Sequence, residues 1–257
     1  MVRLSSTIGP VDAGIVPLLA RTYEERTGTK ITLEAAGTGA TLEKAKDGSF
    51  DMVIVHARAL ENKFIADGYG IDRRDFMYND FLILGPAEDP AKIKGMADAA
   101  AALAKIAESK VHFVTRGDQS GTHVKEMEIW AKAGIHPSSE NDNWYVTCPN
   151  GNKGNAPTLL FANERGAYTL IDRATYLIQK ENITLALLLE KDEALLNFFA
   201  SIQVNPKKFP SVNAGEAKTF IDWLCAEEAQ TIIRDFEAAK FNEPLFFPNS
   251  AEWHAKH

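Results

Sequence analysis

The sequence has little cysteine and no long hydrophobic run. Cys148 and Cys225 are its only cysteines, and 77 positions separate them. This spacing fits neither a metal site nor a redox CxxC motif, so one disulfide and two separate buried thiols both remain open. No run approaches the 18 apolar residues that a membrane-spanning helix needs. The chain of 257 residues, 45% hydrophobic and 25% charged, falls in the range of soluble globular proteins.

An excess of basic residues is also missing. The formal net charge of −7 argues against a nucleic-acid partner, which would require a basic face. Any anion site must therefore be a local cluster of donors in a negative protein. The first residues, MVRLSSTIG, lack a charged segment followed by an apolar one, so no signal peptide is expected. This favours a cytoplasmic protein, or a periplasmic or extracellular one whose leader has been removed.

Signatures of catalysis are missing as well. The dinucleotide fingerprint GxGxxG is absent, and Ser120 lacks the glycine two positions before it that a nucleophile elbow requires. His56 and His123 have no Cys, Asp or Glu at ligand spacing, so they do not indicate a metal site. We therefore expect no catalytic residue, no metal and no cofactor.

What the sequence does contain is a donor-rich segment, Phe113–Lys125. A short strand, Val111–Val114, ends at a loop, and a helix follows whose first turn carries Ser120, Gly121 and Thr122. Free backbone N–H groups, hydroxyls and the helix dipole favour an anion at such a point. Arg116 adds a permanently charged, forked donor. The alternative is an ordinary capped helix with Arg116 in a surface salt bridge.

The order of the expected elements indicates an α/β protein. Three strand–loop–helix units fall within about 85 residues, which is typical of a parallel α/β layer. Asp12 is expected to cap a helix that runs to about Thr27. A further helix is expected over Ala167–Gln179. The expected strands lie at 2–4, 31–35, 51–56, 78–85, 111–114, 144–147 and 185–189. The other expected helices lie at 40–46, 62–67, 96–109 and 158–163, with one or two more over 214–240.

Breaks in the pattern predict two lobes. The segments GPAEDP, after Leu84, and VNPKKFP, near Val204, are interpreted as the two crossings between lobes. Lobe one would comprise residues 1–84 and 205–257, and lobe two residues 85–204. In such folds ligands bind in a cleft at the carboxyl ends of the strands.

Three other loops share the donor-rich character of the Arg116 segment. Ser5, Ser6 and Thr7 precede the first helix, and Thr38 and Gly39 precede the second. Asn155 and Thr158 open a helix of the second lobe, behind the loop GNKGN. Any one of them alone could be a plain helix cap, but four together favour a shared anion pocket.

Several longer runs resemble one known family. GTGATLEKAKDGSFDMVIVHA, DGYGIDRRDFMYNDFLILGPAEDPA, FVTRGDQSGTHVKE and ANERGAYTLIDRATYL are similar to the TupA family, the substrate-binding proteins of bacterial tungstate ABC transporters. The resemblance covers about residues 4 to 248. It implies a type II periplasmic-binding fold with two α/β lobes, two crossovers and a small oxyanion, tungstate or molybdate, in the cleft between lobes. It also implies a non-enzymatic monomer that serves an ABC permease, if the source is bacterial.

The resemblance also implies ligand residues. Arg116 matches the ligand-binding arginine of the family, and Ser120, Gly121 and Thr122 match its SGT turn. The TTTS run that holds the oxyanion in the family is matched by SSTIG here, where Ser6 and Thr7 keep the hydroxyls and Ile8 and Gly9 do not. The glycine-rich GxGMG segment is altered too, and Lys153 offers a charge there. These departures leave open a small organic carboxylate as the ligand, or reuse of the fold as an enzyme or partner module.

Overall fold

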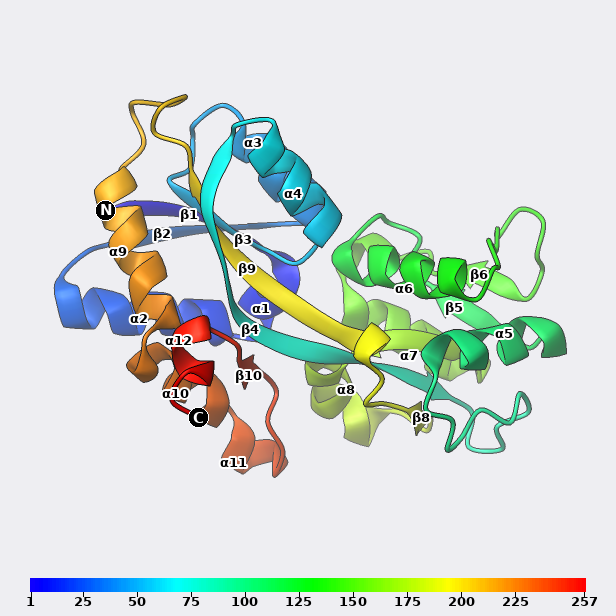
Figure 1. Cartoon of the computed structure of the whole chain (residues 1–257). Helices are drawn as coiled ribbons and strands as arrows, with labels where there is room; N and C mark the ends of the chain where they lie inside the picture. The colour runs from blue at the N-terminus through cyan, green and yellow to red at the C-terminus, as the bar shows by residue number, and fades with distance from the viewer. The chain divides into compact units, whose positions relative to one another are not determined.

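The computed structural model describes the whole chain, residues 1–257, and divides it into two compact units (Figure 1). Unit 1 comprises Met1–Tyr78 and Phe198–His257, and unit 2 comprises Asn79–Asn197. The crossings expected after Leu84 and near Val204 lie a few residues beyond these boundaries. The chain passes between units inside two strands, β4 (Gly70–Gly85) and β9 (Leu196–Val204), so no turn residue marks either crossing.

Unit 1 is built on a mixed sheet with a parallel centre. β1 (Val2–Thr7) pairs in parallel with both β2 (Ile31–Ala36) and β3 (Met52–Val55), and β9 runs antiparallel to β3. β10 (Phe247–Pro248) pairs antiparallel with Met77 and Tyr78 in the middle of β4. All four residues of β3 are buried, as expected of a strand covered on both faces. The carboxyl ends of β1, β2 and β3 therefore meet at one edge of the sheet.

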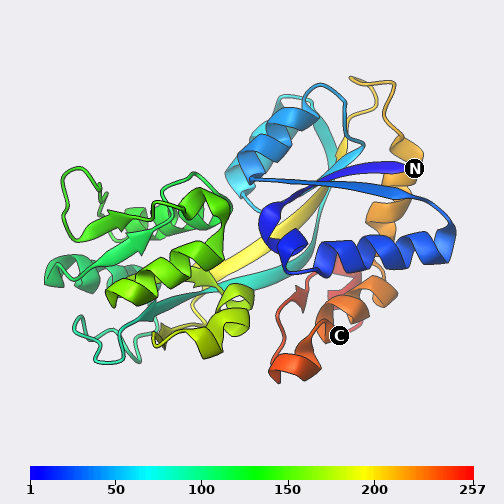
Figure 2. The ribbon, with the colours of Figure 1, turned by 180° about the vertical axis from the view of Figure 1, so that it is seen from behind.

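Helices cover both faces of this sheet. α3 (Thr38–Ala45) and α4 (Arg58–Ala66) lie on one side, and α2 (Ile15–Thr27) lies on the other in both views (Figure 2). Aromatic side chains pack between α2 and α9 (Ala214–Cys225), with the ring centroids of Tyr23 and Phe220 4.7 Å apart. The remaining helices of the unit are α1 (Ile8–Asp12), α10 (Glu227–Asp235), α11 (Ala238–Phe241) and α12 (Ala251–His254).

The expected cap at Asp12 is wrong. Asp12 ends the short helix α1, and α2 begins after Gly14, which has a φ of 92°. A left-handed backbone at Gly14 breaks one expected helix into two, and glycine adopts this conformation at little cost.

Unit 2 has its own sheet. β5 (Phe113–Thr115) pairs in parallel with β6 (Tyr145–Thr147) and with β7 (Tyr168–Asp172), while β7 runs antiparallel to the second half of β4. β8 (Ala186–Leu189) also pairs with β4. Since β5, β6 and β7 are parallel, the loops that follow them emerge at one edge.

The expected helix over Ala167–Gln179 is wrong in its first half. Residues Tyr168–Asp172 form strand β7, and the helix α8 (Arg173–Gln179) begins only after Asp172, whose side chain accepts a hydrogen bond from the Thr175 N–H. The first four residues of β7 are buried, so the strand shows no alternation of apolar and polar residues. Without that alternation, periodicity does not separate a buried strand from a helix.

Four helices and three short 3₁₀ turns complete unit 2. α5 (Ala99–Ser109) packs on α6 (Gly121–Lys132), and α7 (Asn155–Arg165) packs on α8. The turns are Gly151–Lys153, Lys180–Asn182 and Glu193–Leu195. Cys148 in unit 2 and Cys225 in unit 1 are both buried free thiols. Among the helices, none combines the length and apolar character that crossing a membrane requires.

Candidate anion-binding site

Two buried hydroxyl groups lie at the carboxyl edge of the unit 1 sheet without a hydrogen-bond partner. Thr7 ends β1 opposite Ala36, the last residue of β2, and Thr38 follows two residues later. Thr7 is 2% exposed and Thr38 is also 2% exposed, and neither Oγ1 atom is hydrogen-bonded. An unmet buried hydroxyl costs about 1–3 kcal/mol, so two at one edge indicate a place prepared for a polar ligand.

The start of α3 adds backbone donors to these hydroxyls. The N-cap residue Gly37 has no side chain, and the first intrahelical bond runs from the Thr41 N–H to the Gly37 carbonyl at 2.8 Å. The N–H groups of Thr38, Gly39 and Ala40 therefore have no partner within the helix. Together with the helix dipole, these groups favour an anion.

The serines before Thr7 differ from one another. The Ser5 Oγ is buried without a partner, whereas the Ser6 hydroxyl donates to the Thr7 carbonyl at 3.3 Å. Side chains alternate along a strand, so Ser5 and Thr7 share one face of β1 and Ser6 points to the other. Of the two predicted residues on β1, Thr7 is available to a ligand and Ser6 is already engaged. Ser5 was noted in the donor-rich loop but not predicted as a ligand residue, because the sequence does not show which of three consecutive hydroxyl residues share a face.

Arg116 lies at the carboxyl edge of the unit 2 sheet, directly after β5. Its guanidinium donates to Asp118 at 2.6 Å and to the Asn155 side-chain oxygen at 2.7 Å. Asn155 in turn donates to Asp172 at the end of β7. The Arg116 side chain is 10% exposed, so its salt bridge is largely buried rather than on the surface. The Nε atom is buried and has no partner.

The loop after Arg116 is held in an unusual backbone conformation. Gly117 and Gln119 both have positive φ angles, of 63° and 59°. The Ser120 side chain caps α6 by accepting from the His123 N–H at 3.4 Å, as its position at the start of the helix predicts. Gly121 and Thr122 follow as the first two residues of α6, both buried, with N–H groups at the positive end of the helix.

Two titrating groups flank Arg116 in this loop. Burial alone would raise the pKa of Asp118, but hydrogen bonds from Ser120 and the charge of Arg116 lower it overall. Burial lowers the pKa of His123 below its usual value. The ring nitrogen Nδ1 of His123 accepts from the Gln119 N–H at 3.0 Å, so this nitrogen does not serve Ser120 as a base. Asp118 was not predicted as a partner of Arg116, because the run RGD does not show which carboxylate accepts a hydrogen bond from the arginine.

The loop after β6 packs tightly against Arg116. A Cβ atom added to Gly151 would lie 2.2 Å from the Arg116 carbonyl oxygen, so only glycine fits there. Lys153, at the end of the same turn, is exposed. The Thr158 hydroxyl is buried and donates to the Gly154 carbonyl at 3.1 Å, inside its own helix. A hydroxyl has one proton, so Thr158 does not offer it to a ligand in this arrangement, contrary to expectation.

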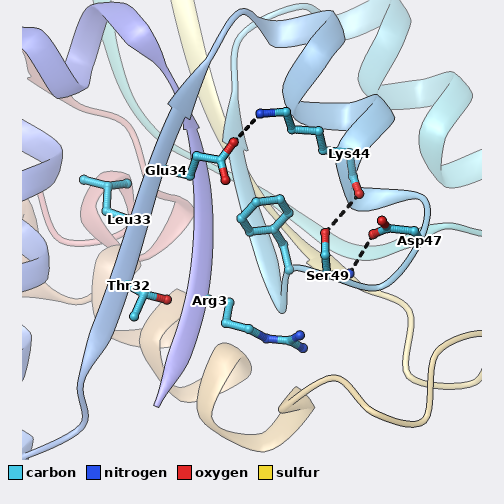
Figure 3. Close-up of a pocket in the computed structure, with 8 residues that line it drawn as sticks. Arg3, Thr32, Leu33, Glu34, Lys44, Asp47 and Ser49 are labelled. Carbon is cyan, nitrogen blue, oxygen red and sulfur yellow. Dashed lines mark hydrogen bonds and ion pairs between the residues drawn. The ribbon is translucent and has the colours of Figure 1, made fainter.

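A separate hollow of about 450 Å³ lies elsewhere in unit 1 (Figure 3). Lys44 on α3 points to Glu34 on β2 and pairs with it, and Asp47 accepts from the Ser49 N–H at 2.8 Å. The Lys44 and Asp47 side chains that line the hollow thus already have partners. This hollow is not the anion site that the donor loops predict.

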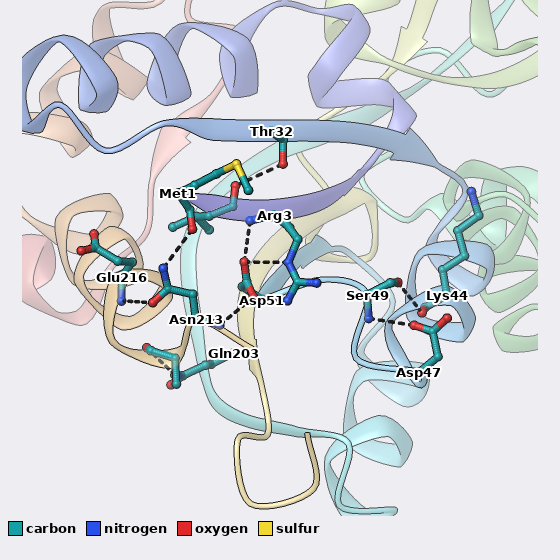
Figure 4. Close-up of polar contacts among 12 residues, drawn as sticks. Met1, Arg3, Thr32, Lys44, Asp47, Ser49, Asp51, Gln203, Asn213 and Glu216 are labelled. Carbon is teal, nitrogen blue, oxygen red and sulfur yellow. Dashed lines mark hydrogen bonds and ion pairs between the residues drawn. The ribbon is translucent and has the colours of Figure 1, made fainter. Parts of the chain in front are cut away.

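Arg3, which also lines the hollow, belongs to a structural network (Figure 4). Asp51 accepts from the Arg3 guanidinium at 2.5 Å, from the Arg3 backbone N–H at 2.7 Å and from the Asn213 N–H at 2.7 Å. It therefore ties the starts of β1, β3 and α9 together. We interpret Arg3 and Asp51 as residues that stabilise unit 1.

Comparison with known proteins identifies relatives over nearly the whole chain. The profile of the PBP superfamily domain matches residues 4–228. The chain is 41% identical to the tungstate-binding protein TupA of Peptoclostridium acidaminophilum over 251 residues, 97% of this chain and 86% of the relative. It is also 41% identical to a putative ABC transporter anion-binding protein of Haloferax volcanii, over 96% of this chain and 71% of that protein.

Solved structures give the same result. The structure of the tungstate-binding protein TupA from Desulfovibrio alaskensis G20 superposes with a TM-score of 0.86 at 37% identity. The match covers 97% of this chain and 98% of the solved one. At this level of identity and coverage the two chains share their fold.

Proposed function

Since the chain belongs to the TupA family within the PBP superfamily, we propose that it captures a small oxyanion, tungstate or molybdate, for an ABC-type transporter. In this proposal each unit offers its own set of donors to an oxyanion. Thr7, Thr38 and the N–H of Gly39 serve from unit 1. Arg116 and the α6 start, Ser120 to Thr122, serve from unit 2.

One observation carries the proposal: three of the donors expected to bind the anion are left without partners in the protein. Thr7 Oγ1, Thr38 Oγ1 and Arg116 Nε are three of only five buried side-chain polar atoms without a hydrogen-bond partner. A dianion such as tungstate presents only acceptor oxygens, and it has no proton to donate. An oxyanion can therefore accept hydrogen bonds from groups of this kind, whereas leaving a buried donor without a partner costs free energy.

The same geometry supports binding without catalysis. His123 is three residues from Ser120 on one helix, and its Nδ1 accepts a backbone N–H. Ser120 serves as a helix cap. With the nucleophile candidate and the base candidate both in structural roles, acyl transfer has no support, and we propose a binding protein that performs no reaction.

A titration panel tests the proposal. Isothermal titration and thermal shift with tungstate, molybdate, sulfate and phosphate should show binding of tungstate or molybdate with a clear rise in the melting temperature. Absence of binding by all four would remove the oxyanion proposal. Acetate, malate and citrate should be included, because Ile8 and Gly9 supply no hydroxyl beside Thr7; binding of a carboxylate alone would favour the organic ligand.

The proposed partner is an ABC permease, and the proposed compartment is the periplasm or the cell exterior. The names of the relatives support this, since one is an ABC transporter anion-binding protein. We propose that the chain acts as a monomer, which light scattering after size exclusion would check. Stimulation of the ATPase activity of a reconstituted permease by the anion-loaded chain would test the partnership, and an unchanged rate would contradict it.

A further inference from the structure

Glu126 is a fully buried carboxyl group on α6, and the proposed binding function does not use it. Glu126 is 2% exposed. Three neutral donors surround it: the Tyr145 hydroxyl at 2.6 Å, the Thr115 hydroxyl at 2.7 Å and the Trp130 indole N–H at 3.0 Å. No Lys or Arg pairs with it in these contacts. A carboxylate held in this way is costly to bury, so its presence requires a reason.

The contacts of Glu126 continue toward Arg116. Thr115 donates its single hydroxyl proton to Glu126, which leaves the oxygen lone pairs of Thr115 facing the next turn. The Gly117 N–H donates to that same oxygen at 3.2 Å. Glu126 thus fixes the orientation of a hydroxyl that spans the turn from Thr115 to Gly117, and Arg116 is the residue at the centre of that turn.

The other elements around α6 offer Glu126 no competing charge. Asp118, in the loop before α6, is a charged group that acts on Glu126, and its negative charge raises the Glu126 pKa. On α5, the buried residues beside α6 are all apolar. On β7, Thr169 donates to the Val114 carbonyl at 2.9 Å, and the Tyr168 hydroxyl bonds to Asp89 and to the Ala91 N–H. Mainly through burial, the Glu126 pKa rises to about 7.

We propose that Glu126 is a positioning residue for the anion site, which acts through the Thr115 hydroxyl to hold Arg116 in its binding orientation. The proposal rests on the proposed oxyanion function. It requires Glu126 to accept the Thr115 proton. A protonated or amide side chain at position 126 would keep one acceptor oxygen and turn the other atom into a donor, so it could not accept from all three groups in the present arrangement.

The first test compares two substitutions at Thr115, with tungstate titrated at pH 8, where the Glu126 carboxyl is ionised. Thr115→Val keeps the shape but removes the hydroxyl, and the affinity should fall about tenfold, equivalent to roughly 1.4 kcal/mol. Thr115→Ser keeps the hydroxyl and should restore affinity to within about twofold of wild type. Tyr145→Phe is the matched control, because it removes a donor from Glu126 and keeps both the Thr115 hydroxyl and its acceptor Glu126.

The second test asks whether the effect passes through Arg116. In an Arg116→Ala background, Thr115→Val and Glu126→Gln should cost no further affinity, since the group that they position is gone. Amide hydrogen exchange of Gly117 gives a readout without any ligand. It should accelerate in Thr115→Val and in Glu126→Gln, but not in Thr115→Ser or Tyr145→Phe.

The outcomes separate this proposal from the proposed function. If wild type binds tungstate and Thr115→Val binds it equally well, the positioning role is overturned and the oxyanion function stands. Losses that simply add in the Arg116→Ala background also overturn it, because they indicate general destabilisation. A wild-type chain that binds none of the four oxyanions overturns both proposals.

Discussion

Arg116 combines a fixed position with an unmet donor. Asp118 and Asn155 each accept from one end of its guanidinium, which leaves Nε and the remaining terminal hydrogens for a ligand. We predict that Arg116→Ala weakens tungstate binding by about 2–5 kcal/mol, as expected when one partner of a buried charge pair is removed. Arg116→Lys should recover only part of this loss, because an ammonium group cannot reproduce the fork. Isothermal titration measures both.

Arg165→Ala is the charge-matched control for this prediction. Arg165 is exposed in the last turn of α7 in the same unit, and its guanidinium packs 4.4 Å from the Phe161 ring. Its removal should leave the affinity unchanged. Equal affinities of wild type and Arg116→Ala would place the site elsewhere in the chain. Arg116→Ala should also lower the unfolding midpoint, since it leaves the buried Asp118 without its cation.

Glu126 gives a prediction for pH and stability. Burial raises its pKa from 4.5 to about 7 in the folded protein, so the folded state binds more protons than the unfolded state in this interval. The free energy of unfolding therefore falls as the pH rises from 4.5 through 7. The contribution of the protonated Glu126 carboxyl to stability is complete below its unfolded pKa. Wild type should lose about 3 kcal/mol relative to Glu126→Gln across this window. Urea unfolding of wild type and Glu126→Gln at several pH values checks this prediction. If the free energies of unfolding of the two proteins change with pH in parallel, the Glu126 pKa is not raised.

Among elements, the start of α3 is the clearest contributor to the unit 1 site. Thr38 and Thr41 are both buried on this helix, one turn apart, but only Thr41 is within reach of carbonyl acceptors, those of Ser6 and Ala36 at 3.5 Å. We predict that Thr38→Val weakens tungstate binding by about tenfold, the loss of one hydrogen bond to a charged ligand. Thr41→Val should leave binding intact and lower stability instead. The reverse pattern in titration and unfolding would exclude Thr38 from the site.

The network at Asp51 should set much of the stability of unit 1. Burial raises the pKa of Asp51, but donors from Arg3 and Asn213 lower it more, so the net pKa is below the usual value. We predict that Asp51→Asn lowers the free energy of unfolding by about 1.5–3 kcal/mol at neutral pH. The difference should persist down to about pH 4 and vanish as the pH falls through the lowered folded pKa. Asp47→Asn, in the exposed neighbouring loop, is the control, and an equal effect of both changes would contradict the role of Asp51.

The element scale also shows where sequence patterns succeed and fail. The helix that begins after Ser120 was predicted because its cap and its apolar spacing agree. β7 was interpreted as helix because it is buried along most of its length and runs directly into α8. The buried Glu126 lies two residues from the more exposed Glu128, and the sequence alone does not separate them, because only packing decides which face of α6 turns inward.

For the whole molecule, the two-part organisation was predictable and its boundaries were not. Proline and glycine mark turns, whereas this chain crosses between units within β4 and β9, where strand residues continue without interruption. The α/β class and the family follow from motifs spread along the chain. The sequence does not show which hydroxyl groups are available to a ligand. Thr7 and Thr158 are both buried threonines, and they differ in whether a carbonyl acceptor lies within reach of the hydroxyl.

Calorimetric titration of tungstate into the wild-type chain, Thr38→Val and Arg116→Ala is the most direct measurement of the oxyanion function. One anion per chain is expected, with weaker binding in both variants, because each variant removes one of the proposed donors. Two anions per chain, or a loss of affinity in only one variant, would contradict the proposed set of donors. The absence of any binding heat together with an unchanged melting temperature would contradict the function itself.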